Sequence, residues 1–228
     1  MKIFGFILLI CLLTQNSFGQ EQELKKMPKR TDKFIRMQGI RLGMDVTRPF
    51  QDFWNKGSRY GTEFSADVEL LPNFFPVVET GWEKFKMNHD YVSYSGSGSY
   101  TRLGCDYNFL PAEHKLDKDM LYVGLRYGFS LAKQRVSSYS FENYWEQTTG
   151  SFPSQNYHSH WLEFVLGMKG EIFENFFMGW SIRGKVMLAQ KEFEMPPVYF
   201  TPGYGNATNS FNFDFTYSVY YTLPFGQK

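Results

Sequence analysis

A strict alternation of large apolar and polar residues recurs along this chain, and it constrains the fold more than any other feature of the sequence. The last alternating stretch, residues 211–225, reads FNFDFTYSVYYTLPF, with a large apolar residue at nearly every second position. Successive side chains of a β-strand point to opposite faces of the sheet. The stretch therefore predicts a strand with one apolar face and one polar face.

Seven earlier stretches alternate in the same way. The eight expected strands cover residues 39–47, 60–70, 77–85, 99–109, 120–132, 160–171, 177–189 and 211–225. Each has about the 9–11 residues, or slightly more, that a tilted membrane-spanning strand needs. Short connections follow the second, fourth and sixth strands, and mostly longer ones follow the others, above all residues 133–159 and 190–210. Because alternate connections of an antiparallel barrel lie at opposite ends, one rim is expected to carry short turns and the other long loops.

The first residues predict export from the cytoplasm. Lys2 precedes an apolar run over residues 3–13, and the small residues around Gly19 suit cleavage of a Sec-type signal peptide after that glycine. A polar arm rich in Lys and Arg follows over residues 20–38. Cleavage would leave Cys105 as the only cysteine, which excludes an intrachain disulfide.

Two architectures share this periodicity. A soluble barrel of the lipocalin kind turns its apolar faces inward around a ligand, whereas an outer-membrane barrel turns them outward to lipid. Glycines on the polar faces favour the second, because small residues inside a narrow barrel leave room for long charged side chains. We therefore expect an ion-paired network in the lumen, made of Arg41, Asp45, Glu63, Asp67, Glu79, Glu83, Arg102, Asp106, Arg126, Glu163, Lys169, Arg183, Lys185 and Asp214.

The exported start, the eight alternating stretches and the aromatic final stretch resemble small Gram-negative outer-membrane barrels, and more narrowly an uncharacterised family of such barrels in Bacteroidota. The resemblance covers about residues 39–225. It implies an all-β fold, an eight-stranded antiparallel transmembrane β-barrel over residues 39–228, with a periplasmic N-terminal arm. The protein would lie in the outer membrane of a Gram-negative bacterium, surrounded by outer-membrane lipid.

The resemblance also gives the final stretch a role in insertion, because the barrel-assembly machinery recognises an aromatic-rich last strand. The residues that carry this pattern are Phe211, Phe213, Phe215, Tyr217, Val219, Tyr221 and Phe225. Families of this type often end on an aromatic residue, whereas here Gly226, Gln227 and Lys228 follow Phe225.

No residue set in the sequence predicts catalysis, a metal site or a cofactor. His158, Ser159 and His160 with Glu163 partly resemble the residues of an eight-stranded lipid deacylase, but the spacing differs and an extended chain turns Ser159 away from both histidines. The two histidines share one side, yet the sequence supplies no third metal ligand. A net charge of +1 argues against a nucleic-acid partner.

Aromatic residues crowd the two longest connections. They can either pack together as a cap or bind a partner protein. Together with the neighbouring Val198, they are Tyr139, Phe141, Tyr144, Trp145, Phe152, Tyr157, Phe193, Tyr199, Phe200 and Tyr204.

These features lead us to expect a non-enzymatic structural or accessory barrel that binds other outer-membrane proteins. The resemblance adds a larger outer-membrane assembly complex as one setting. A secreted soluble barrel that binds an apolar ligand and a surface lipid hydrolase are the alternatives.

Overall fold

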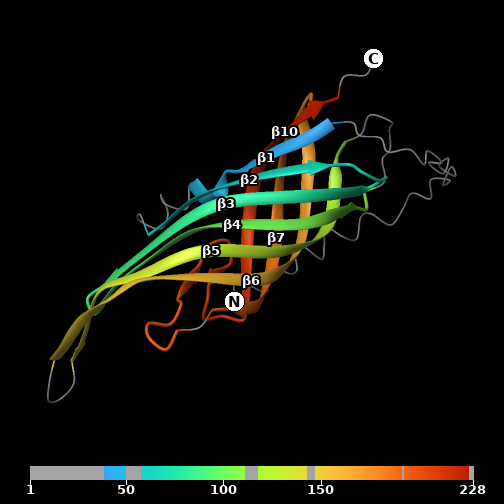
Figure 1. Cartoon of the computed structure of the whole chain (residues 1–228). Helices are drawn as coiled ribbons and strands as arrows, with labels where there is room; N and C mark the ends of the chain where they lie inside the picture. Colours follow the sequence, from blue (N-terminus) through green and yellow to red (C-terminus); the bar gives the residue numbers. More distant parts are fainter. Residues whose placement is uncertain (1–38, 50–57, 111–117, 143–146, 192, 226–228) are drawn as a thin grey trace, which may run out of the picture. The chain divides into compact units, whose positions relative to one another are not determined.

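The computed structural model describes residues 39–49, 58–110, 118–142, 147–191 and 193–225 (Figure 1). The expected signal peptide over residues 1–19 and the expected arm over residues 20–38 lie outside these ranges. Within them, eight antiparallel strands of one sheet close into a ring in the order β1-β10-β7-β6-β5-β4-β3-β2, and two short strands form a separate hairpin.

All eight stretches predicted from the alternation form the strands of this ring. The strands are β1 (Gly39–Asp45), β2 (Arg59–Val68), β3 (Phe74–His89), β4 (Val92–Asn108), β5 (Met120–Glu142), β6 (Gln147–Phe173), β7 (Phe176–Gln190) and β10 (Phe211–Pro224). The separate hairpin consists of β8 (Phe200–Thr201) and β9 (Gly205–Asn206). The prediction of an all-β fold with eight antiparallel strands is therefore confirmed.

The four central strands extend much further than the alternation indicated. The strands β3 and β4 continue to a turn at Asp90 and Tyr91, and β5 and β6 run on to Glu142 and from Gln147 (Figure 1). The prediction of a long loop over residues 133–159 is wrong, because most of that segment pairs as two antiparallel strands with shifts in register. The third connection is likewise a tight turn and not a long loop.

The last strand closes the ring against the first. The pairing runs from Gly39 opposite Pro224 to Asp45 opposite Ser218. On its other edge, β10 pairs with β7 from Phe211 to Tyr221. The C-terminal strand therefore completes the backbone hydrogen bonding of the sheet, which leaves no long edge open.

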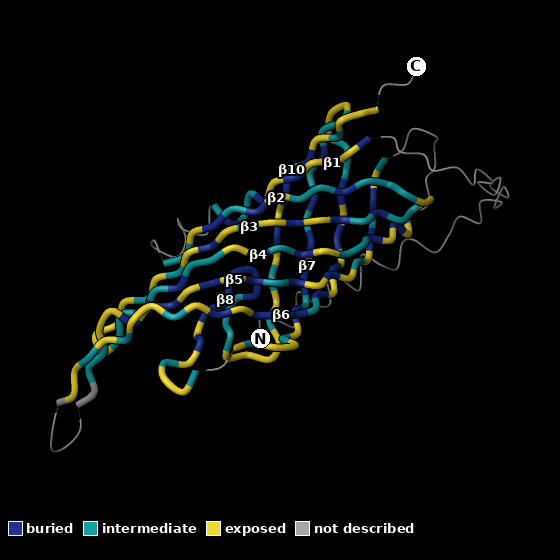
Figure 2. Tube along the Cα trace, viewed as in Figure 1, coloured by how far each residue is buried: buried dark blue, intermediate teal, exposed yellow. Residues whose placement is uncertain are grey.

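Buried and exposed residues alternate along the strands (Figure 2). On β1, for example, Arg41 and Asp45 are buried while Leu42 and Met44 are exposed. Most large apolar side chains of the ring point outward, and the buried charged side chains point inward. This distribution is the reverse of that in a water-soluble domain, where charged residues are almost never fully buried.

Candidate functional site

The fourteen charged residues expected in the lumen all lie on the inward face of the ring. Thirteen are buried, and Asp214 is half-buried. Arg102 has 0% of its surface exposed, and its guanidinium contacts three carboxylates. The distances are 2.9 Å to Glu63, 2.7 Å to Glu79 and 2.9 Å to Glu163. Buried charges are stable only when they are paired and hydrogen-bonded, and this arrangement meets that condition.

The remaining charges extend the network along the barrel. Arg183 donates to Glu79 at 2.5 Å and lies 3.4 Å from Glu163. Toward the end of the ring where β1 begins, Lys169 donates to Asp67 at 2.8 Å. Members of the network come from strands that include β2, β3, β4, β6 and β7. The network therefore joins strands that are not neighbours in the sheet.

Two arginines that the sequence analysis missed complete the network. Arg48, just after β1, contacts Asp45 at 3.1 Å, Glu63 at 2.9 Å and Asp214 at 3.3 Å, and it also pairs with Glu83. Arg59 at the start of β2 lies 3.0 Å from Glu83.

The predicted set itself held the signal for these two residues. It contains six cations and eight anions, whereas a buried network needs balanced charge. Arg48 and Arg59 bring the described network to eight of each.

Aromatic rings fill the space beside several inward-facing glycines. A Cβ at Gly43 would lie 2.4 Å from the ring of Tyr220, and one at Gly81 would lie 2.4 Å from Tyr100. Gly128 stands in the same relation to Trp161, at 2.2 Å. Each glycine is the cross-strand partner of its aromatic residue. Glycine therefore makes room for rings as well as for the charged side chains that the sequence analysis had in view.

The connection between β7 and β10 inserts the tip of its β8–β9 hairpin into the lumen. The N–H of Gly203 donates to Glu83 at 2.7 Å, and its carbonyl accepts from Lys185 at 2.7 Å. Tyr204 packs against Trp161 and is buried. The backbone of this hairpin thus hydrogen-bonds to Glu83 and Lys185, two members of the charge network on the inward face of the ring.

Four of the eight described residues that could form either a cap or a partner contact are buried inside the protein. Val198, Phe200, Tyr204 and Tyr157 are buried, which is incompatible with direct partner contact in this structure. Phe193, Tyr139 and Phe152 are half-buried, while Tyr199 is exposed. The expected residues Tyr144 and Trp145, and the side chain of Phe141, lie outside the described part. Of the two roles that the sequence left open, the cap describes the β7–β10 connection.

The filling leaves almost no empty space in the lumen. A cavity of about 10 Å³ lies among Glu63, Glu79, Arg126, Lys169 and Arg183. That volume is about the least that can hold one water molecule. The described residues therefore form a plugged barrel, in which side chains and the inserted hairpin occupy the interior.

Replacing Gly203 should release the inserted hairpin. Gly203 has φ = 79°, and a Cβ there would lie 2.6 Å from the ring of Tyr100. We expect Gly203→Ala to speed amide hydrogen exchange over residues 199–206 by roughly tenfold or more, since the strain and the clash together cost about 1–3 kcal/mol. Gly205→Ala is the matched control, because its φ is 111° but its nearest neighbour is 3.8 Å away. Equal exchange in both variants would contradict the role of the ring contact.

The residues considered for catalysis do not converge. Ser159 is buried and faces the lumen, whereas His158 and His160 face outward. His160 bonds through Nδ1 to the hydroxyl of Tyr127 at 2.6 Å, and Glu163 accepts from Trp161 at 2.6 Å. Among the described residues, no cluster of three or more His, Cys, Asp or Glu side chains could hold a metal ion.

The residues of the final strand that were assigned a role in insertion point away from the lumen. Phe211, Phe213, Phe215, Tyr217, Tyr221 and Phe225 are exposed, and Val219 is half-buried. In the described part of the chain, none of the helices has the length and apolar character needed to span a membrane.

Comparison with known proteins adds a family but no activity. A search of curated proteins gave no significant match. A family model described as "Domain of unknown function (DUF6048)" matches residues 1–228, which is the whole chain. The chain therefore belongs to the DUF6048 family.

Proposed function

We propose that this protein is a non-enzymatic outer-membrane β-barrel with a closed polar lumen, acting as a structural or accessory subunit beside other outer-membrane proteins. The observation that carries the proposal is the chemistry of the outer wall. Its exposed residues include Leu125, Phe164 and Phe213, the last with 73% of its surface exposed. A water-soluble monomer rarely exposes apolar patches of more than a few hundred Å², whereas lipid requires such a wall.

The wall is continuous over the described strands. On β5 it runs from Leu121 to Leu131, and from Leu121 to Tyr127 the paired residues on β4 and β6 continue it around the ring. Over this height, the outward positions of the described strands hold no Asp, Glu, Lys or Arg. The charges lie inside, where they pair with one another, so the barrel suits an apolar surrounding better than water.

The filled lumen supports a structural role and not a transport role. A barrel of eight strands is just wide enough for its own side chains to fill it. Here ion pairs, aromatic rings and the inserted Gly203 occupy that space. A soluble barrel that binds an apolar ligand would need an apolar interior cavity, and the described lumen is polar.

The long hairpin of β5 and β6 supports the accessory part of the proposal. It extends beyond the other strands of the ring (Figure 1). Tyr139 and Phe152 stack near its base, with ring centroids 5.1 Å apart. An ordered arm of this kind can contact a neighbouring protein without changing the barrel, and interfaces are rich in such aromatic residues.

Fractionation of cells that produce the full chain tests the proposal. We expect the protein in the outer-membrane fraction after density separation, with a folded form that migrates differently from the heated form on a gel. It should be extracted by detergent only. Release into buffer after gentle osmotic lysis would contradict the membrane location and favour the soluble barrel.

A further inference from the structure

Four cations form a compact group on the outward face of β3 and β5. They are Lys84, Lys86, Lys133 and Arg135, and all four are exposed. Ser97 on β4 pairs with both Lys84 and Lys133, and Ser95 pairs with both Lys86 and Arg135. The four side chains therefore lie in two adjacent cross-strand rows, with a serine at the centre of each row.

The structure supplies no counter-charge for this group. None of the four cations forms an ion pair with another residue in the described ranges. The neighbouring outward positions are Asn88, Ser93, Ser99 and Asn156, which carry no charge. Beneath the group, inward-facing Phe85, Tyr94 and Val136 make an apolar cluster. Four like charges so placed repel one another and favour an anion from outside the chain.

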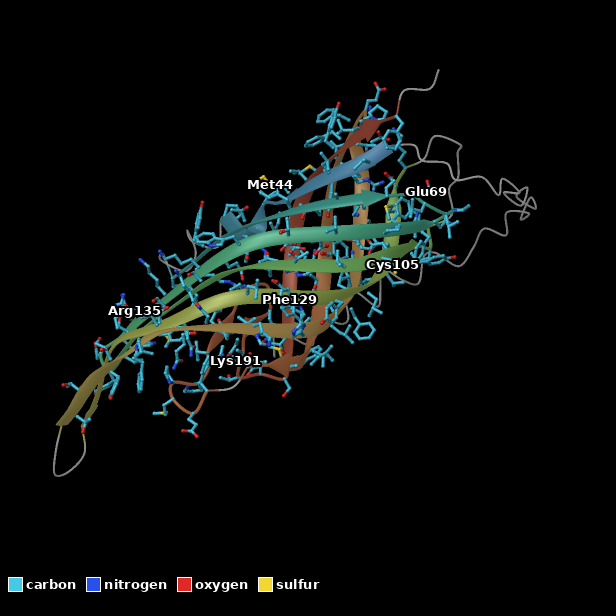
Figure 3. The ribbon with its side chains drawn as sticks, viewed as in Figure 1. Met44, Glu69, Cys105, Phe129, Arg135 and Lys191 are labelled. Carbon is cyan, nitrogen blue, oxygen red and sulfur yellow. The ribbon has the colours of Figure 1, made fainter. Side chains whose placement is uncertain are left out.

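The group also borders the apolar wall directly. Trp82 and Leu131, both exposed, occupy the outward row adjacent to Lys84 and Lys133. Figure 3 shows Phe129 further along the sheet and Arg135 toward the hairpin end. Among the described residues of the ring, no other two adjacent cross-strand rows hold four exposed cations. A ligand at this position must carry negative charge at one end, to pair with the cations, and an apolar group at the other, to contact the wall.

We propose that Lys84, Lys86, Lys133 and Arg135 bind the phosphate groups of a lipid headgroup, whose acyl chains lie along the wall below Trp82 and Leu131. The inference rests on the proposed membrane location. Rows two residues apart on a strand are separated by about 7 Å, and strands two apart by about 10 Å. The four cations can thus surround one phosphate or engage two.

The residue types suit a phosphate ligand. Arg135 can donate two parallel hydrogen bonds to phosphate oxygens, while the lysines act as mobile point charges. Ser95 and Ser97 add hydroxyl donors between the cations. Serine residues on an outward face contribute nothing to an apolar wall. Phosphate binding gives Ser95 and Ser97 on β4 a role.

Lipid binding by the purified full chain in neutral detergent tests the inference. The probe is a bis-phosphorylated, multiply acylated glucosamine disaccharide (lipid A), and the comparison probe is the same lipid without phosphate. We expect native mass spectrometry to show at least tenfold more binding of the phosphorylated lipid to the wild type. Replacement of all four residues with Gln should remove that preference. A charge-conserving variant with Lys84→Arg, Lys86→Arg, Lys133→Arg and Arg135→Lys should keep it.

Three results would overturn the inference. They are equal binding of both lipids by the wild type, unchanged preference in the Gln variant, or displacement by an equal concentration of inorganic phosphate, which would show that acyl chains contribute nothing. The Gln variant must also fractionate with the outer membrane as the wild type does. A wild type that is released into buffer rejects the proposed function itself, whereas membrane-bound protein without the lipid preference rejects only this site.

Discussion

Leu125→Arg should block insertion of the barrel or strongly destabilise it. Leu125 points outward near the middle of the apolar wall, with 46% of its surface exposed, between Cys105 on β4 and Phe164 on β6. An arginine near the midplane of a bilayer costs a β-barrel about 2 to 4 kcal/mol. We expect most of the variant to fail to produce the heat-modifiable folded form, and any folded fraction to unfold in lipid vesicles at lower urea concentration.

Leu125→Phe is the matched control for this test. It keeps an apolar side chain at the same exposed position, and its stability in vesicles should stay close to that of the wild type. If Leu125→Arg folds as well as Leu125→Phe, the wall does not contact lipid, because an exposed arginine in water has little cost.

Arg102→Met should be the most damaging change within the lumen. The substitution removes the cation that lies within 3 Å of Glu63, Glu79 and Glu163. Removing one partner of a buried ion pair costs about 3–5 kcal/mol, because the remaining charge has no compensation. We expect the free energy of unfolding, measured with urea in detergent or vesicles, to fall by an amount in this range. The variant should still fractionate with the outer membrane.

Two further variants separate charge from packing at Arg102. Glu163→Gln in the Arg102→Met background removes one of the three carboxylates that lose Arg102 and should recover part of the lost stability. Lys191→Met removes an exposed cation and should change the free energy of unfolding by no more than about 0.5 kcal/mol. Equal losses from Arg102→Met and Lys191→Met would contradict the ion-paired network.

The ring of eight strands could be predicted from the sequence because apolar outward residues and polar inward residues alternate along its strands. The extensions of β4 and β5 could not. There the outward residues become Ser95 and Arg135 while the inward ones become Tyr94 and Val136, so the faces exchange character. Alternation still holds, but it no longer identifies an apolar wall. Residues 133–159 consequently resembled a loop in sequence.

The centre of the lumen was only partly predictable for a different reason. Arg48 follows β1 next to Pro49, outside any alternating stretch, and its buried side chain still reaches Asp214 of the network at 3.3 Å. Gly203 contributes through its backbone alone, so no side chain could reveal it. The excess of acids in the predicted set was the one sequence signal that pointed to missing cations, and only the fold could identify them.

The accessibility of Cys105 to a charged, water-soluble maleimide tests the central claim most directly. Cys105 lies in the same outward row as Leu125 and is partly exposed. A Cys11→Ser chain leaves Cys105 as its only thiol, and Ser97→Cys in a chain that also lacks Cys105 provides a control thiol beside the cationic group. In isolated envelopes, we predict that Ser97→Cys reacts readily while Cys105 reacts only after denaturation. Equally rapid labelling of Cys105 in the native envelope or in a soluble fraction would show that the wall faces water, which would contradict the account.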